Sequence, residues 1–374
     1  MSGRRSRLVV ATVTIVALAG AAAAAWISPT IGGDVEDAAS RTSAAEPSVG
    51  ATSPSPAGTS SPSTSSRAEC TGQVPAGGDI QVAADEHGPG ATICLTGSYV
   101  VAEPLRPHDG QRFVGPASIE AGPDVHTGFE LKGDDSGIAV NAEDVTLVDL
   151  DVHGFGLRAV ECWSGMTILG GTFHDNGRNG IGCGLEYGDG PVVIDGAEIY
   201  ENGTEEQLGR GSGGIKLARL GPGGFTLRDS SVHDNLGNGV WCDVQCIGTF
   251  LIEGNTIEGN TRKGVLYEKS GASDEYIDGK IVEGEALVRA NTVTGNGAEG
   301  RTYAADGGIV GVSSTNIRIV GNTTRENHRA GVVLKTDGRL SGEKHGWPVE
   351  AALVDNVLDD GIIGCDEPGV ACPR

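Results

Sequence analysis

Side chains that can carry acid–base chemistry recur at matching positions in short segments that begin with Gly-Ile or Gly-Val. Lys216 and Trp241 each stand two residues after such a glycine, whereas Asp243 and Glu268 stand four residues after one. If the segments are neighbouring parallel strands, equivalent residues form columns on one face, about 4.8 Å apart. The two acids are then adjacent, with the lysine and the tryptophan beside them. Trp163 falls in the column of the acids.

Three chemistries are open to this group of side chains. The two carboxylates could bind Ca²⁺ through their oxygen atoms. They could act as acid and nucleophile at the roughly 5–5.5 Å separation of retaining glycosidases, with Trp241 as a platform for a sugar ring. Alternatively, Lys216 could remove a proton beside a uronic-acid carboxylate, after calcium on Asp243 and Glu268 has acidified that proton. An ordinary polar outer face with charges of both signs is the simpler interpretation, and it stays open.

Basic side chains gather near Lys216 although the chain as a whole is acidic. The sequence has 27 Lys and Arg against 50 Asp and Glu, a net charge of −23. Arg219 follows Lys216 closely, and nearby segments add Arg262, Lys263 and Lys269. Such a patch would help to hold an anionic glycan that the rest of the chain repels. Because no basic stripe stands out, nucleic acid is not an expected partner.

Histidine–aspartate pairs occupy one equivalent position in two segments, at His174-Asp175 and His233-Asp234. Such a pair could be a general base with its orienting carboxylate, or part of a metal site. Other segments place Tyr, Glu, Thr or Arg at this position, so a solvated edge is the favoured interpretation. One further segment lies between the two pairs, which puts the histidines about two rungs, roughly 10 Å, apart.

These columns depend on a sequence repeat that runs from about residue 145 to residue 361. Its short strands alternate apolar and polar residues, have glycine and asparagine at their corners and show no helical periodicity, which predicts a stacked β-solenoid. A repeated asparagine can bond its equivalent one coil away. Successive units end on Asn176, Asn202, Asn235, Asn260, Asn296 and Asn327, which lie 26, 33, 25, 36 and 31 residues apart.

The repeat resembles that of right-handed parallel β-helix proteins of the pectate-lyase-like superfamily, over roughly residues 75–360. The resemblance implies an all-β domain whose first coil is capped by a short amphipathic helix, here at about residues 79–85. It also favours the proton-abstraction chemistry, since several such enzymes use a basic residue with calcium on this kind of face. The chain has no catalytic signature of a lyase family, so no residue receives a role from the resemblance.

All eight cysteines follow residue 67, and an even count in an exported chain predicts disulfides. Their spacings lack the CxxC pattern of a zinc site. The repeat places Cys162 and Cys183 in one inward column of neighbouring coils, within the roughly 4.4–6.8 Å between α-carbons that a disulfide accepts. Pairing by proximity gives Cys70–Cys94, Cys162–Cys183, Cys242–Cys246 and Cys365–Cys372, the last of which would hold the tail over the final coil.

The first 67 residues predict an export segment and a tether. Arg4, Arg5 and Arg7 precede an uncharged stretch, and residues 1–27 are therefore either a cleaved signal peptide or an uncleaved membrane anchor. Residues 28–67 are rich in Ser, Thr, Pro and Ala, which predicts a disordered linker. A single β-helix domain then spans residues 68–374, secreted or held at the outer face of the cytoplasmic membrane.

The expected function is the binding and cleavage of an extracellular polysaccharide, with a uronic-acid-containing one favoured, by lyase or hydrolase chemistry. The alternative is a non-catalytic surface protein whose solenoid is a rigid spacer or an adhesive platform. We expect a monomer, with Ca²⁺ on Asp243 and Glu268 as the cofactor if there is one. The candidate catalytic residues are Lys216, Asp243 and Glu268, and the candidate substrate-binding residues are Trp241, Arg219 and Trp163.

Overall fold

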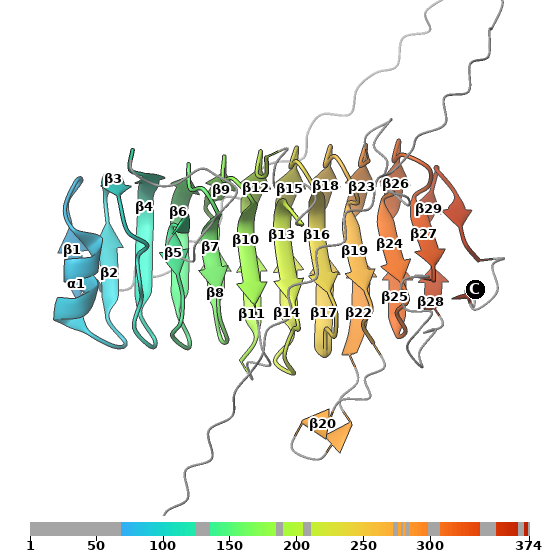
Figure 1. Ribbon diagram of the computed structural model, residues 1–374, viewed down its shortest axis with the longest axis horizontal. Helices are drawn as coiled ribbons and strands as arrows, with labels where there is room; N and C mark the ends of the chain where they lie inside the picture. The colour runs from blue at the N-terminus through green and yellow to red at the C-terminus, as the bar shows by residue number, and fades with distance from the viewer. Residues whose placement is uncertain are drawn as a thin grey trace, which may run out of the picture. The chain divides into compact units, whose positions relative to one another are not determined.

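The described part of the chain is a stack of coils in which each strand pairs in parallel with its equivalent in the next coil (Figure 1). A computed structural model describes residues 69–123, 135–184, 190–204, 211–271, 276–277, 280–281, 284–297, 307–336, 349–365 and 370–372. The predicted parallel β-solenoid is therefore confirmed. The predicted export segment at 1–27 and the linker at 28–67 lie outside the described residues. Within those ranges no helix is both long and apolar enough to cross a membrane.

A 20-stranded sheet contains two strips that share the long strands β4 (Arg112–Ala121) and β6 (Thr146–His153). The first strip runs β1 (Gly72–Val74), β2 (Thr92–Leu95), β4, β6, β8 (Thr167–Leu169), β11 (Val192–Asp195), β14 (Phe225–Arg228), β17 (Gly248–Glu253), β22 (Gly284–Arg289), β25 (Ile317–Val320), β28 (Val349–Val354) and β31 (Val370–Ala371). The second strip runs β3 (Gly97–Val101), β4, β6, β9 (Thr172–His174), β12 (Glu198–Tyr200), β15 (Ser231–His233), β18 (Thr256–Glu258), β23 (Thr292–Thr294), β26 (Thr323–Arg325) and β29 (Val357–Leu358).

A separate nine-stranded parallel sheet completes each coil. It runs β5 (Ile138–Ala139), β7 (Arg158–Cys162), β10 (Asn179–Gly184), β13 (Gly213–Ala218), β16 (Asn238–Asp243), β19 (Val265–Glu268), β24 (Ile309–Val312), β27 (Val332–Lys335) and β30 (Ile362–Ile363). The remaining strands, β20 (Tyr276–Ile277) and β21 (Lys280–Ile281), form a short antiparallel pair.

The helix α1 (Ile80–His87) lies at the N-terminal end of the stack, as predicted. The side chain of Asp79 accepts a hydrogen bond of 3.0 Å from the backbone N–H of Val82 and so caps the first turn. Ile80 and Ala84 face inward and are buried. The amide of Gln111 donates to the Ala84 carbonyl at 2.8 Å, which ties the helix to the first coils.

The interior is one continuous apolar core that the alternation of the strands creates. In β12, for example, Ile199 is fully buried between the more exposed Glu198 and Tyr200. Phe225 and Phe250, which are equivalent residues of neighbouring coils, stack with their rings 5.8 Å apart, and Phe250 stacks across the interior on Tyr267 at 5.6 Å. Each coil therefore supplies the surface that covers its neighbour's apolar side chains.

Two ladders of buried asparagines connect the coils at their corners. In the first ladder, which was predicted, each side-chain amide donates to the side-chain oxygen of the next asparagine at 2.9–3.1 Å, from Asn176 to Asn327. The amide of Asn327 donates to the carboxylate of Asp360 at 3.0 Å. The second ladder, which was not predicted, contains Asn255, Asn291, Asn322 and Asn356 at the corner between the two strips. Both ladders satisfy backbone and side-chain groups that water cannot reach.

Four disulfides join the cysteine pairs named from the sequence: Cys70–Cys94, Cys162–Cys183, Cys242–Cys246 and Cys365–Cys372. Cys162 and Cys183 are partners in the register of β7 and β10, with α-carbons 4.6 Å apart. Near the C-terminus, β31 pairs with β28 and adds a strand beside the final coil.

Candidate functional site

The outer side of the nine-stranded sheet brings Lys216, Trp241 and Asp243 together. Strand register pairs Lys216 with Trp241 and Asp243 with Glu268, in agreement with the predicted columns. The intervening residues, such as Leu217, are buried in the core, so the lysine, the tryptophan and Asp243 face outward.

Lys216 is held between a carboxylate and an aromatic ring. Its Nζ atom lies 3.0 Å from Oδ2 of Asp243 and 3.8 Å from the centre of a Trp241 ring. The side chain of Lys216 is only 17% exposed and that of Asp243 is 22% exposed. The ammonium group therefore covers one face of the ring that the sequence analysis assigned to a sugar.

Burial lowers the pKa of the Lys216 amine, and the positive charges of Arg178 and Arg158 lower it further, whereas Asp243 opposes the shift. Arg158 is itself paired with Glu161 at 3.1 Å. Its guanidinium lies over Gly182, where an added Cβ atom would collide with it. Lys216 therefore gives up its proton more readily than an ordinary lysine.

We call this surface the cationic face, and define it by Arg158, Arg178, Lys216, Trp241 and Asp243. Arg219 stands at its border, immediately after β13, and is exposed. The N–H of Arg219 donates to the carbonyl of Asp243 at 3.3 Å, which ties it to the next coil. Further basic residues flank β19, namely Arg262, Lys263 and Lys269.

Two of the predicted site residues are less accessible than a polar outer face would make them. Glu268 is buried, with 7% of its surface exposed, although it neighbours Asp243 in the register. Trp163 follows β7 and is partly buried against the main core. Beyond β16 several outer side chains of the sheet are apolar: Leu266, Val310, Val312 and Val333 belong to a second buried cluster that packs against Trp241.

The arrangement does not fit the predicted calcium site on Asp243 and Glu268. An oxygen of Asp243 already pairs with the Lys216 ammonium, and Ca²⁺ requires six to eight oxygen ligands. In the described part of the chain, a group of three His, Cys, Asp or Glu ligands occurs elsewhere, at Asp151, His153 and His174. We therefore derive no chemistry from calcium at this position.

A second constellation lies on the outer side of the second strip. The rings of His153, His174, Tyr200 and His233 stack in that order, with centroids 4.8, 4.6 and 5.2 Å apart. We call these four residues the histidine ladder. It confirms that His174 and His233 are two rungs apart. The histidine side chains are 16–25% exposed, and the paired carboxylates of Asp175 and Asp234 are 59% and 64% exposed, so both pairs lie at a partly solvated edge.

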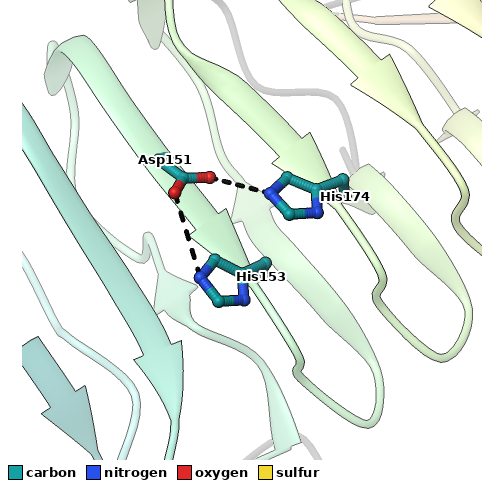
Figure 2. A group of neighbouring side chains, drawn as sticks. All are labelled: Asp151, His153 and His174. Carbon is teal, nitrogen blue, oxygen red and sulfur yellow. Dashed lines mark hydrogen bonds and ion pairs between the residues drawn. The ribbon is translucent and has the colours of Figure 1, made fainter. Parts of the chain in front are cut away.

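Carboxylates flank the rings of the histidine ladder. Figure 2 shows Asp151 between His153 and His174, with Oδ1 2.9 Å from His174 Nε2 and Oδ2 3.9 Å from His153 Nε2. Burial raises the pKa of the Asp151 carboxyl, but hydrogen bonds from Thr172 and Ser118 and the charges of the two histidines outweigh it, so the net shift is downward. Asp151 and His153 were not among the predicted site residues because their coil has Phe155 at the position of the ladder asparagine. The signal that could have found them is the alignment of His153 with His174.

The chain is similar to known proteins of the parallel β-helix fold. A family model described as a right handed beta helix region matches residues 125–279. The chain is a right-handed parallel β-helix protein. The resemblance to the pectate-lyase-like superfamily is thereby confirmed at the level of fold.

Several solved structures resemble this β-helix protein at low identity. The A-module of the Azotobacter vinelandii mannuronan C-5 epimerase AlgE6 is 16% identical, with a TM-score of 0.50 over 78% of this chain and 83% of that one. The periplasmic alginate epimerase AlgG is 14% identical, with a TM-score of 0.47 and coverage of 82% and 84%. The pectate lyase Pel9A is 13% identical, with a TM-score of 0.42 and coverage of 81% and 80%. No curated protein sequence matches the chain significantly.

The disulfides of this β-helix protein bear on its compartment. All eight cysteines are paired, and such disulfides form and persist in oxidising surroundings outside the cytosol. This agrees with the expectation of a secreted or extracellular protein, whereas the signal peptide or anchor itself stays a prediction.

Proposed function

We propose that the protein binds an acidic, uronic-acid-containing polysaccharide on the cationic face and cleaves it by β-elimination. The observation that carries the proposal is Lys216, a largely buried amine of lowered pKa beside two arginines, in a chain whose net charge is −23. A local excess of positive charge attracts a polyanion that the rest of the surface repels. Similarity in fold to enzymes whose names include alginate epimerase, mannuronan epimerase and pectate lyase is in keeping with a polysaccharide substrate.

In this proposal Arg158 and Arg178 hold the carboxylate of a uronic-acid residue beside Lys216. Their charges stabilise the negative charge that develops on that residue as the proton next to its carboxylate leaves. The neutral amine of Lys216 takes the proton, the electron pair forms a carbon–carbon double bond, and the bond from the neighbouring carbon to the glycosidic oxygen breaks. The leaving oxygen takes a proton from solvent. One chain thus becomes an unsaturated end and a new reducing end, and no water is consumed.

Lys216 is suited to the role of base because its pKa is lowered, which raises the fraction of neutral amine near neutral pH. Asp243 fixes the position of the amine through the 3.0 Å ion pair. We place Arg219 at the border of the site as an additional contact for the polyanion. Glu268 and Trp163 receive no part in the reaction because both are withdrawn from the surface.

The test compares two variants that each remove one positive charge. Lys216→Gln acts on the cationic face, and Arg325→Gln acts on an exposed side chain of the second strip. Polygalacturonate and alginate are the acidic polymers, and a neutral galactan is the control polymer. We expect Lys216→Gln to weaken binding by about tenfold or more and to abolish the ultraviolet absorbance of unsaturated products, with Arg325→Gln unchanged.

Two results would count against the proposal in different ways. Equal affinity for the acidic and neutral polymers would show that the cationic face does not select an acidic polysaccharide. Binding without unsaturated products or new reducing ends would show that the protein does not cleave the polymer. The function would then be that of a non-catalytic glycan platform, which was the alternative expected from the sequence.

A further inference from the structure

In the described part of the chain, a group of three potential metal ligands lies on the second strip, away from the cationic face. Strand register pairs Asp151 with Thr172 and His153 with His174 across β6 and β9. Val152 and Phe173, which alternate with them, are fully buried in the core. Asp151, His153 and His174 therefore project from the same outer surface, where Figure 2 shows both rings directed at the carboxylate.

The distances suit a shared metal ion. One ligand atom from each side chain lies within 4.8 Å of the other two. In a tetrahedral site with metal–ligand bonds of about 2.0–2.1 Å, ligand atoms lie roughly 3.3 Å apart. The carboxylate reaches both rings, with Oδ1 2.9 Å from His174 Nε2 and Oδ2 3.9 Å from His153 Nε2. A bound ion would draw the three ligand atoms closer together.

A second carboxylate orients His174 as a ligand. Its Nδ1 atom lies 2.7 Å from Asp175 Oδ2, while its Nε2 atom faces Asp151. Metal-binding histidines characteristically donate their other ring N–H to a carboxylate, which fixes the tautomer that presents the metal-binding nitrogen. Thr172 donates to Oδ1 of Asp151 at 2.8 Å and fixes the carboxylate in turn. The triad thus has an outer set of hydrogen bonds as well as three ligands.

We propose that Asp151, His153 and His174 bind a divalent transition-metal ion of the Zn²⁺ type. Two imidazoles with one carboxylate suit Zn²⁺, Co²⁺, Ni²⁺ or Fe²⁺, whereas Ca²⁺ prefers oxygen ligands alone. Three protein ligands leave at least one coordination position for water or for an added ligand. A ring nitrogen binds a metal ion only in its unprotonated form, so any proton on His174 Nε2 would pass to solvent when the ion binds.

The histidine ladder itself contains a matched control. His233 has a carboxylate near each ring nitrogen, Asp234 at 2.9 Å and Glu198 at 3.2 Å, and it stacks on Tyr200. In the described ranges, however, it belongs to no group of three metal ligands. His233→Gln therefore removes a stacked histidine of the same kind without removing a ligand.

The experiment titrates the full chain with Zn²⁺ after chelator treatment, in the presence of excess Mg²⁺ to occupy scattered acidic groups. Binding is followed by calorimetry, and Co²⁺ is used in parallel because its visible absorption reports the ligand geometry. We expect one tight site per chain in the parent protein and in His233→Gln, and its loss in His153→Gln and His174→Gln. Asp175→Asn, which keeps all three ligands, should weaken the site by about 10- to 100-fold.

Circular dichroism shows whether each variant is folded. If a variant that lacks a ligand does not fold, Asp175→Asn still tests the site because it keeps all three ligands. The proposal is wrong if His153→Gln and His174→Gln bind Zn²⁺ as the parent does, or if His233→Gln weakens binding as much as they do. Because no polysaccharide enters this assay, its outcome is independent of the function proposed for the cationic face.

Discussion

The cationic face and the histidine ladder are built on the same coils but use their columns in different ways. On the cationic face, successive residues of a column differ in type, and the lysine of one coil contacts both a tryptophan and an aspartate of the next. In the histidine ladder, successive residues are flat rings, and each stacks on its neighbour. The coil geometry is equivalent in both places. The repeat therefore decides which residues meet, and the residue types decide whether they form an ion pair or a stack.

The largest effect is expected from a substitution in the first asparagine ladder, at the corner between the second strip and the nine-stranded sheet. Asn260 is buried between β18 and β19, donates to Asn296 and Val232, and accepts from Asn235. Asn260→Ala leaves several of these groups unsatisfied, so the free energy of unfolding should fall by roughly 3–5 kcal/mol. Urea denaturation measures it, with the exposed Thr256→Ala as the control. A loss no greater than that of the control would show that the ladder does not hold the coils together.

The next largest effect should follow from removing the negative charge of Asp243 from the cationic face. Asp243 opposes the lowering of the Lys216 pKa, so Asp243→Asn should lower that pKa further. Lys216 then becomes neutral at a lower pH, and the acidic limb of the pH profile of polymer cleavage should move downward. Asp195→Asn, which removes a carboxylate paired with Arg228 on the first strip, should leave the profile unchanged. If the acidic limb moved upward or did not move, Lys216 would not be the base of the reaction.

A smaller effect should follow from moving one arginine without changing any charge. The guanidinium of Arg158 occupies the space above Gly182, so Gly182→Val should displace it. Because a partly exposed ion pair contributes about 0.2–1 kcal/mol, the acidic polymer should bind about two- to fivefold more weakly. Thr256→Val, at an exposed strand position on the second strip, tests for a general effect of a surface valine. Equal losses in the two variants would mean that Arg158 does not contact the polymer.

The smallest effect concerns the histidine ladder and depends on pH. Burial lowers the pKa of His233, but hydrogen bonds from its ring to Asp234 and Glu198 outweigh burial and raise the pKa above the ordinary value. A raised folded-state pKa contributes stability that is fully present below the unfolded-state pKa and is lost as pH rises through the folded-state pKa. His233→Gln should therefore destabilise the protein more at pH 5 than at pH 8, as measured by urea denaturation. A destabilisation that is the same at both pH values would show that the charge of His233 contributes nothing.

The sequence contains most of the fold, because the repeat fixes the register. The alignment of glycine-led segments was sufficient to place Cys162 beside Cys183 and Lys216 beside Trp241, as the strand pairing shows. The alignment failed at the coil of β6, where one long strand spans both strips and Phe155 takes the place of an asparagine. That failure concealed Asp151 and His153.

Contacts between side chains were harder to predict than columns. The period gives the direction of each side chain but not its rotamer, so it could not show that the Lys216 ammonium lies over the ring of Trp241. Nor could it show that Glu268 and Leu266 are buried, because the outer side of a strand is covered by packing that the two-residue period does not record. The predicted calcium site required Glu268 to be accessible and Asp243 to be unpaired, and neither condition holds.

The first asparagine ladder also has a direction. Every bond between two of its side chains runs from an amide N–H to the oxygen of the asparagine in the next, C-terminal coil, so these bonds all point the same way and reinforce one another. The last partner, Asp360, is a carboxylate that accepts from the backbone N–H and from the side-chain amide of Asn327. A group that only accepts ends the series without leaving a donor unsatisfied, and its negative charge faces the positive end of the aligned bonds. Because the aspartate carboxylate has no N–H to donate to a further coil, an engineered extension of the solenoid would first have to restore asparagine at this corner.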